Sequence, residues 1–135
     1  MKIITRMLED EVYESKNTHG HAVRIDMRGA GLKENQSPVE LLLSSLSACA
    51  AVDIAIMLKK RRKAIADFTI ETTGVRRDEP PRRFTDIHCL FIIQSADVTE
   101  EELQKVAALS LEKYCSVAAT LNSRITFSVR VNRPE

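Results

Sequence analysis

The stretch SPVELLLSSLSACAAVDIAIML, residues 37–58, decides the fold. Ser37 and Pro38 suit the N-cap and the first helical position, and Glu40 three residues after Ser37 completes a capping box. The pattern predicts a helix from about residue 38 to about residue 62. Because this helix is apolar or small on nearly every side, we expect the rest of the chain to bury it on every side.

Length and composition indicate one globular domain over residues 1–135, large enough for a hydrophobic core without disulfides. A net charge of +1 gives no broad field for nucleic acid or an anionic membrane, so we expect neither as a partner. Three cysteines do not fit a paired disulfide framework. The first residues carry no apolar run of a signal peptide, so the sequence predicts a cytoplasmic protein with reduced thiols.

Residues 41–58 raise the question of a membrane span, because they carry one charge and precede the run KKRRK. The charged residue, Asp53, costs roughly 2.5–3.5 kcal/mol at a bilayer centre, against roughly 0.3–0.6 kcal/mol gained per Leu or Ile. The Ser and Ala content leaves little to offset that cost, so the sequence predicts a core helix. The basic run suits the negative end of the helix dipole.

The rest of the chain reads as an α+β domain. Thr99 and Glu102 form a second capping box, and the helical pattern shifts phase at Cys115, where a short third helix is predicted. Proline and charge over residues 76–83 predict a hairpin turn. Strands are predicted within residues 2–14, where one or two fit, and at 21–26, 68–75, 84–94 and 125–132. We expect helix one to pack on an antiparallel sheet.

Two cysteines have unusual neighbours. Cys49 lies among alanines, which let another backbone or a small substrate approach closely. Cys115 lies at a predicted helix start, where free amides and the dipole favour a thiolate and lower its pKa. Either residue alone is more commonly a buried core residue. Cys89 shares a strand face with Ile87 and Phe91, so we expect it in the core.

Two motifs, S-P-x-E-L-L-L-x-x-L-x-A-C-x-A-x-D and E-K-Y-C-S-V-A, resemble the osmotically inducible protein C (OsmC) family and its organic hydroperoxide resistance (Ohr) relatives. The resemblance covers most of the chain and is weakest over the first twenty residues. It implies an OsmC-like fold, with antiparallel sheets packed around a long buried central helix. It also implies an intertwined homodimer with sites at the subunit interface.

The resemblance implies cysteine-based reduction of hydroperoxides, with no cofactor or metal. The Cys49 thiolate would attack the peroxide and become a sulfenic acid, and Cys115 would condense with it to a disulfide. An external dithiol would then reduce that disulfide. The expected substrates are small organic hydroperoxides, and the expected role is defence against oxidative stress.

In the family, an arginine and a glutamate promote the thiolate. The family glutamate directly follows the proline, where this chain has Val39, and Glu40 comes one residue later. Nine residues at about 100° each put Glu40 nearly opposite Cys49 on an ideal helix, so both a capping and a catalytic role stay open. Arg24, within GHAVRID, is the first candidate for the family arginine, and Arg28 is the second. The alternative is that Arg24 is simply an exposed residue of a strand.

Asp53 lies one helical turn after Cys49, and a carboxylate there disfavours the thiolate. This favours an alternative function, a non-catalytic small-ligand binding or stress-related module with both cysteines reduced. A zinc site is not expected, because no cysteine pair has the spacing of two to four residues. The sequence therefore predicts a thiol-dependent hydroperoxide reductase, with Cys49, Cys115, Arg24 and Glu40 as candidate site residues.

Overall fold

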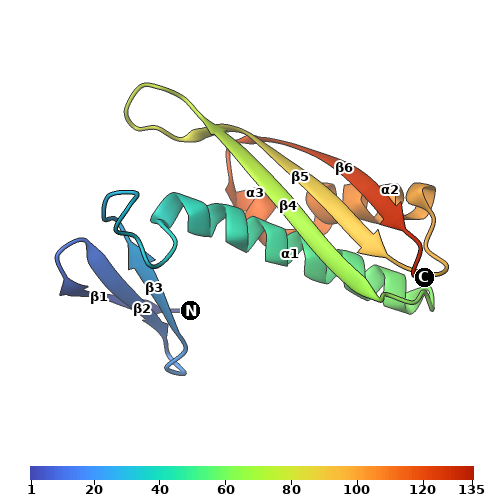
Figure 1. Ribbon diagram of the computed structural model, residues 1–135, viewed down its shortest axis with the longest axis horizontal. Coiled ribbons are helices and arrows are strands. Elements are labelled where there is room, and N and C mark those ends of the chain that lie inside the picture. The colour runs from blue at the N-terminus through green and yellow to red at the C-terminus, as the bar shows by residue number, and fades with distance from the viewer. The chain divides into compact units, whose positions relative to one another are not determined.

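The structure, a computed structural model, describes residues 1–135 (Figure 1). In chain order the elements are β1 (Ile3–Glu9), β2 (Val12–Asn17), β3 (Ala22–Asp26), α1 (Pro38–Lys60), β4 (Asp67–Arg76), β5 (Phe84–Gln94), α2 (Glu100–Leu109), the π-helical turn η1 (Ser110–Tyr114), α3 (Ser116–Thr120) and β6 (Arg124–Asn132). The predicted α+β class and element order are confirmed. The residues gather into two compact units, Met1–Leu42 and Leu43–Glu135. That the whole chain forms a single domain stays a prediction.

The first unit contains the antiparallel sheet β1-β2-β3. The fully buried carboxylate of Asp26, at the end of β3, accepts hydrogen bonds from Arg28 Nη2 at 2.7 Å and from the Glu34 amide at 2.9 Å. These bonds order the loop that leads to α1. Every residue of β1 is exposed, including Ile4 and Met7, so this sheet buries little apolar surface in the single chain.

The predicted capping box at the start of α1 is confirmed. The Ser37 amide donates to Glu40 Oε1 at 3.0 Å, and the Glu40 amide donates to Ser37 Oγ at 3.3 Å. The bond from the Ser37 amide lowers the pKa of the Glu40 carboxyl, because it stabilises the charged form. Two amides that the helix leaves free are satisfied in this way.

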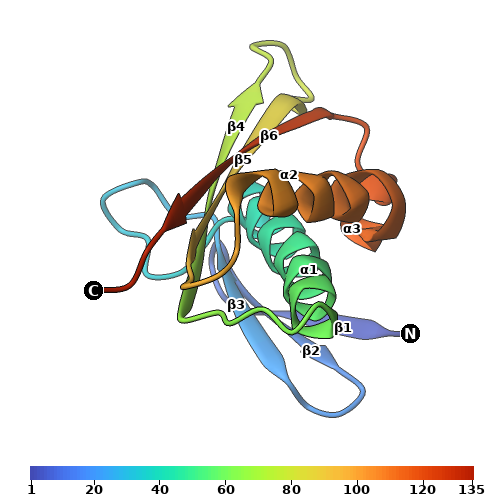
Figure 2. The same cartoon turned by 90° about the vertical axis from the view of Figure 1, so that its right-hand side faces the viewer.

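The second unit contains the sheet β4-β5-β6, with α1 and α2 against the same face (Figure 2). Strands β4 and β5 are antiparallel, as expected. Strands β5 and β6 are parallel, from Asp86 opposite Arg124 to Gln94 opposite Asn132. The expectation of purely antiparallel sheets is therefore wrong for this pair. The reason is the connection through α2, η1 and α3, which returns the chain to the starting end of β5.

The core of this unit lies between the sheet and the helices. It comprises alternate residues of β5 and helically spaced residues of α1 and α2: Ile87, Cys89, Phe91, Ile93, Leu46, Ala50, Ile54, Leu58, Leu103, Val106 and Ala107. Cys89 is fully buried, as predicted, and burial raises the pKa of its thiol. The Ser47 and Thr72 hydroxyls, 2.6 Å apart, join α1 to β4.

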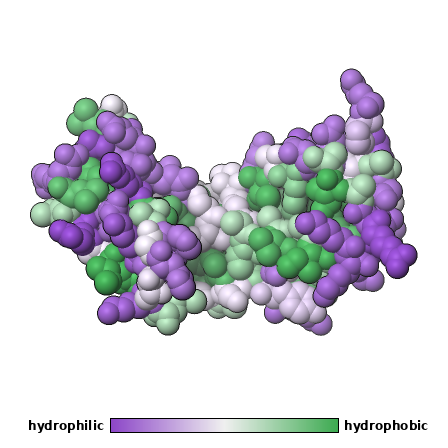
Figure 3. Space-filling model, turned by 90° about the horizontal axis from the view of Figure 1, so that it is seen from below, coloured by the Kyte–Doolittle hydropathy of each residue, from purple (hydrophilic) through white to green (hydrophobic).

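Only one stripe of α1 is buried, so the expectation of burial on every side is wrong for the single chain. A single sheet covers one side of a helix, and on the other side Val52 is 57% exposed and Ile56 is 47% exposed. The view from below includes green, apolar patches on the surface (Figure 3). In length and composition α1 could cross a membrane, but a core helix of a globular protein meets the same two criteria.

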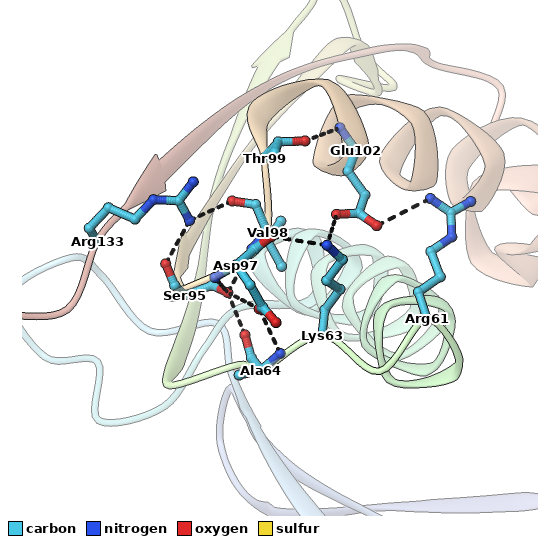
Figure 4. A network of polar contacts seen from close by, with 9 residues as sticks. All are labelled: Arg61, Lys63, Ala64, Ser95, Asp97, Val98, Thr99, Glu102 and Arg133. Atoms are coloured by element: carbon cyan, nitrogen blue, oxygen red, sulfur yellow. Dashed lines mark hydrogen bonds and ion pairs between the residues drawn. The ribbon is translucent and has the colours of Figure 1, made fainter.

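Polar contacts tie the end of α1 to the start of α2 (Figure 4). Thr99 caps α2 by accepting from the Glu102 amide at 3.1 Å, as predicted. The Glu102 carboxylate, however, lies 3.7 Å from Arg61 and 3.4 Å from Lys63, so it faces the basic run. The nearby Asp97 carboxylate accepts from the Ala64 amide at 2.9 Å. The basic run thus has a structural partner besides the helix dipole.

Candidate active site

Cys49 lies in the middle of α1 and is half-buried. It directly precedes Ala50, a member of the buried stripe, so its side chain lies at the edge of the core. The predicted placement of Cys49 on the central helix is confirmed, and its thiol is free.

Cys115 is the N-cap of the short helix α3. Its amide donates to the Ser110 carbonyl at 2.7 Å and closes η1, and its sulfur accepts from the Ala118 amide at 3.4 Å. A π-helical turn holds one more residue than an α-helical turn, which explains the phase shift in the sequence pattern. The predicted start of a new helix at Cys115 is confirmed.

One buried hydrogen bond connects the segments that carry these two cysteines. The Ser110 hydroxyl donates to the Ala50 carbonyl at 3.0 Å. The two thiols lie near enough to affect each other, since the interaction with Cys49 raises the pKa of the Cys115 thiol. Both cysteines are free thiols. The structure therefore brings Cys49 and Cys115 together from positions 66 residues apart, 115 minus 49.

The pKa of the Cys115 thiol is raised, whereas the sequence predicted that it would be lowered. Burial raises it to about 11, and the interaction with Cys49 acts in the same direction. The amides of Ala118 and Val117 lower it, but burial outweighs them. The expected lowering by the helix start is therefore wrong, because the sequence shows the amides but not the depth of burial.

Arg24 and Glu40 lie in the first unit. Arg24 is exposed on β3 and makes no hydrogen bond or ion pair within the chain that would hold its guanidinium. Arg28, the second candidate, is instead committed to Asp26. Glu40 is engaged in the capping box. The roles of Arg24 and Glu40 toward the thiols stay predictions.

Sequence reasoning singled out Asp53 but missed the cavity beside it. A cavity of about 380 Å³ is lined by Asp53, Ile56, Met57, Lys60 and Tyr114. Asp53 Oδ2 is buried and accepts no hydrogen bond within the chain. The signal available in the sequence was a lone acid inside an apolar helix. No three His, Cys, Asp or Glu side chains are grouped so that they could hold a metal ion.

Known proteins resemble this chain over nearly its whole length. Protein YhfA of Escherichia coli (strain K12) is 30% identical over 128 residues, which are 95% of this chain and 94% of YhfA. A hypothetical protein from Aquifex aeolicus VF5 is 28% identical, with a TM-score of 0.87 and coverage of 99% of this chain and 97% of its own.

A more distant structure, the organic hydroperoxide resistance protein OhrB of Bacillus subtilis, shares the fold at 15% identity. Its TM-score is 0.63, over 97% of this chain and 98% of its own. The model of the family described as OsmC-like protein matches residues 31–130, which include α1 and both interacting cysteines. This chain therefore belongs to the OsmC-like protein family.

Proposed function

We propose that this protein is a thiol-dependent reductase of organic hydroperoxides that acts in the cytoplasm in defence against oxidative stress. The observation that carries the proposal is the interaction between the free thiols of Cys49 and Cys115. Membership of the OsmC-like family supports this proposal, and so does the fold shared with an organic hydroperoxide resistance protein.

In the proposed reaction the Cys49 thiolate attacks one peroxide oxygen and the O–O bond breaks. The departing alkoxide takes a proton and leaves as an alcohol, and Cys49 becomes a sulfenic acid. The Cys115 sulfur then forms a disulfide with Cys49, and the hydroxyl leaves as water with the Cys115 proton. An external dithiol restores both thiols and is itself oxidised to a disulfide.

The order of the two cysteines follows from access. Cys115 is buried, whereas Cys49 is half-buried and is the easier thiol for a peroxide to reach. Burial also raises the pKa of the Cys115 thiol, which disfavours the thiolate that attacks a peroxide. We therefore assign the attack to Cys49 and the resolving step to Cys115. We propose Arg24 and Glu40 as the charged residues that promote the Cys49 thiolate, as the family pattern implies.

A second copy of the chain is the proposed partner. Large apolar side chains stay exposed on β1, such as Ile4 and Met7, and on α1, such as Val52 and Ile56. A monomeric soluble protein rarely exposes contiguous apolar patches of this kind. A homodimer would cover them.

A non-catalytic binding module is the second candidate, favoured by the Asp53 carboxylate one turn after Cys49. Counting free thiols before and after one equivalent of cumene hydroperoxide separates the two. The reductase loses two of its three thiols, the Cys49→Ser variant loses none, and the control Cys89→Ser still loses two. Survival of all three wild-type thiols for minutes would contradict the reductase and leave the binding module.

A further inference from the structure

The buried side of α2 follows a regular helical spacing as far as Ser110, at the start of η1. Ser110 marks the side that faces α1, because its hydroxyl donates to the Ala50 carbonyl at 3.0 Å. In a continuous α-helix the next residue on this side would be Tyr114, four residues after Ser110. The fully buried residues that define the spacing are Leu103, Val106, Ala107 and Ser110.

The structure places Cys115 on that side in the place of Tyr114. Cys115 is 3% exposed, whereas Tyr114 is 58% exposed. The cause is η1, in which the Cys115 amide donates to the Ser110 carbonyl at 2.7 Å, a bond that spans five residues rather than four. Cys115 therefore lies over Ser110 along the helix axis. At about 100° per residue, an α-helical continuation would turn Cys115 about 140° away from Ser110.

The side chains on the outside of η1 give no separate reason for the extra residue. Glu112 and Lys113 are exposed, and neither makes a hydrogen bond or an ion pair through its side chain within the chain. On the inside, the turn changes which residue faces α1. That residue is the cysteine whose thiol lies near the thiol of Cys49. Single π-helical turns inside helices occur frequently at functional sites, which fits this placement.

We propose that η1 positions Cys115: the extra residue of this turn places the thiol on the side of the helix that faces Cys49 and turns Tyr114 outward. The proposal rests on the proposed function in one respect, because the disulfide between Cys49 and Cys115 is a step of that reaction. The placement of the thiol itself needs no peroxide.

Diamide tests the placement without a peroxide. This azo compound takes the hydrogens of two thiols, is reduced to a hydrazine and leaves a disulfide, so the rate reports how well two thiols meet. The wild type should form the disulfide between Cys49 and Cys115. The double variant Tyr114→Cys with Cys115→Ala moves the thiol to the outward side, and we expect it to cross-link to Cys49 at least about tenfold more slowly. The matched control Lys113→Ala keeps the turn and should leave the rate unchanged.

Restoring the register should restore the disulfide. One alanine inserted after Lys113 in the double variant makes the introduced thiol the fifth residue after Ser110, and the wild-type rate should return. A loss caused by lower stability would not be repaired in this way. Wild-type cross-linking in the double variant would overturn the proposal, and so would a folded insertion variant without rescue. If circular dichroism shows that the insertion prevents folding, the double substitution still decides, because an α-helical register predicts faster cross-linking from position 114 than from position 115.

Cumene hydroperoxide separates this proposal from the proposed function. In the double variant Cys49 should be oxidised at the wild-type rate, but its sulfenic acid should persist and be trapped by dimedone. A sulfenic acid that disappears as fast as in the wild type would contradict the positioning role. If cumene hydroperoxide oxidises no thiol in any variant while diamide gives the expected order of rates, the proposed function fails and the placement of Cys115 by η1 stands.

Discussion

The hydroxyl group of Ser110 donates a 3.0 Å hydrogen bond to the carbonyl oxygen of Ala50, the residue that follows Cys49. Five residues after Ser110, Cys115 donates its amide back to the Ser110 carbonyl at 2.7 Å. Ser110 is thus bonded both to the helix that carries one thiol and to the residue that carries the other. Both Ser110 and Ala50 are fully buried, so solvent does not compete for this bond.

Ser110→Ala should lower the free energy of unfolding by about 1 kcal/mol, the usual net contribution of one hydrogen bond. It should also slow disulfide formation after oxidation, because η1 is less firmly held against α1. Urea unfolding gives the first quantity and stopped-flow thiol loss gives the second. The matched control Ser116→Ala, at an exposed serine beside Cys115, should change neither. Equal effects of both substitutions would show that the buried bond has no special role.

The raised pKa of Cys115 predicts a pH dependence of stability. Folding shifts this pKa from its ordinary value of 9.0 to about 11, so the native state keeps a proton that the unfolded chain releases. The stabilising contribution is complete below the lower value and is lost as the pH rises through about 11. Urea unfolding across this range should show a smaller decline for Cys115→Ala than for the wild type.

The decline that remains in Cys115→Ala belongs partly to Cys89, whose pKa burial also raises. Identical pH profiles for wild type and Cys115→Ala would contradict the assigned protonation of Cys115.

Arg24 and Arg28 should differ in what their removal changes. Arg28→Ala leaves the buried Asp26 carboxylate without its ion pair, so it should lower the unfolding temperature. Arg24→Ala should change stability by less than about 0.5 kcal/mol, because the side chain is exposed. It should slow oxidation of Cys49 by cumene hydroperoxide about tenfold, which corresponds to about 1.4 kcal/mol of lost transition-state stabilisation. A rate unchanged by Arg24→Ala would remove this residue from the site.

Local signals in the sequence predicted most of the fold. The capping box of Ser37 and Glu40 marks the start of α1, and the N-cap residue Thr99 marks the start of α2. Alternation over residues 84–94 gives the bounds of β5. These features depend on side chains that bond or alternate within a few residues, which one sequence displays directly.

Features that depend on distant contacts were not predictable. The parallel pairing of β5 and β6 depends on where the crossover ends, and the burial of α1 depends on how many layers cover it. Glu102 fitted a capping box, yet Arg61 and Lys63 attract its carboxylate from beyond the end of α1. At the site, Cys49 and Cys115 were predictable as candidates from their neighbours in the sequence, but the depth of burial that raises the Cys115 pKa appears only in the folded chain.

Glu40 offers a test of capping against catalysis. Its pKa is lowered from an ordinary value of 4.5 by the Ser37 amide, so its stabilising contribution is present above that value and is lost as the pH falls through the native pKa. Glu40→Gln should therefore flatten the acid side of the stability profile, measured by urea unfolding. It should also slow Cys49 oxidation at neutral pH if the proposed role holds. An unchanged rate with a flattened profile would leave Glu40 as a helix cap alone.

The most direct test of the central claim is intact-protein mass spectrometry with disulfide mapping, after one equivalent of cumene hydroperoxide at neutral pH. Our account predicts a mass lower by two hydrogen atoms and a single new cross-link between Cys49 and Cys115. Two results would contradict it. One is a mass that stays that of the reduced protein, and the other is the addition of oxygen to Cys49 while Cys115 stays a free thiol.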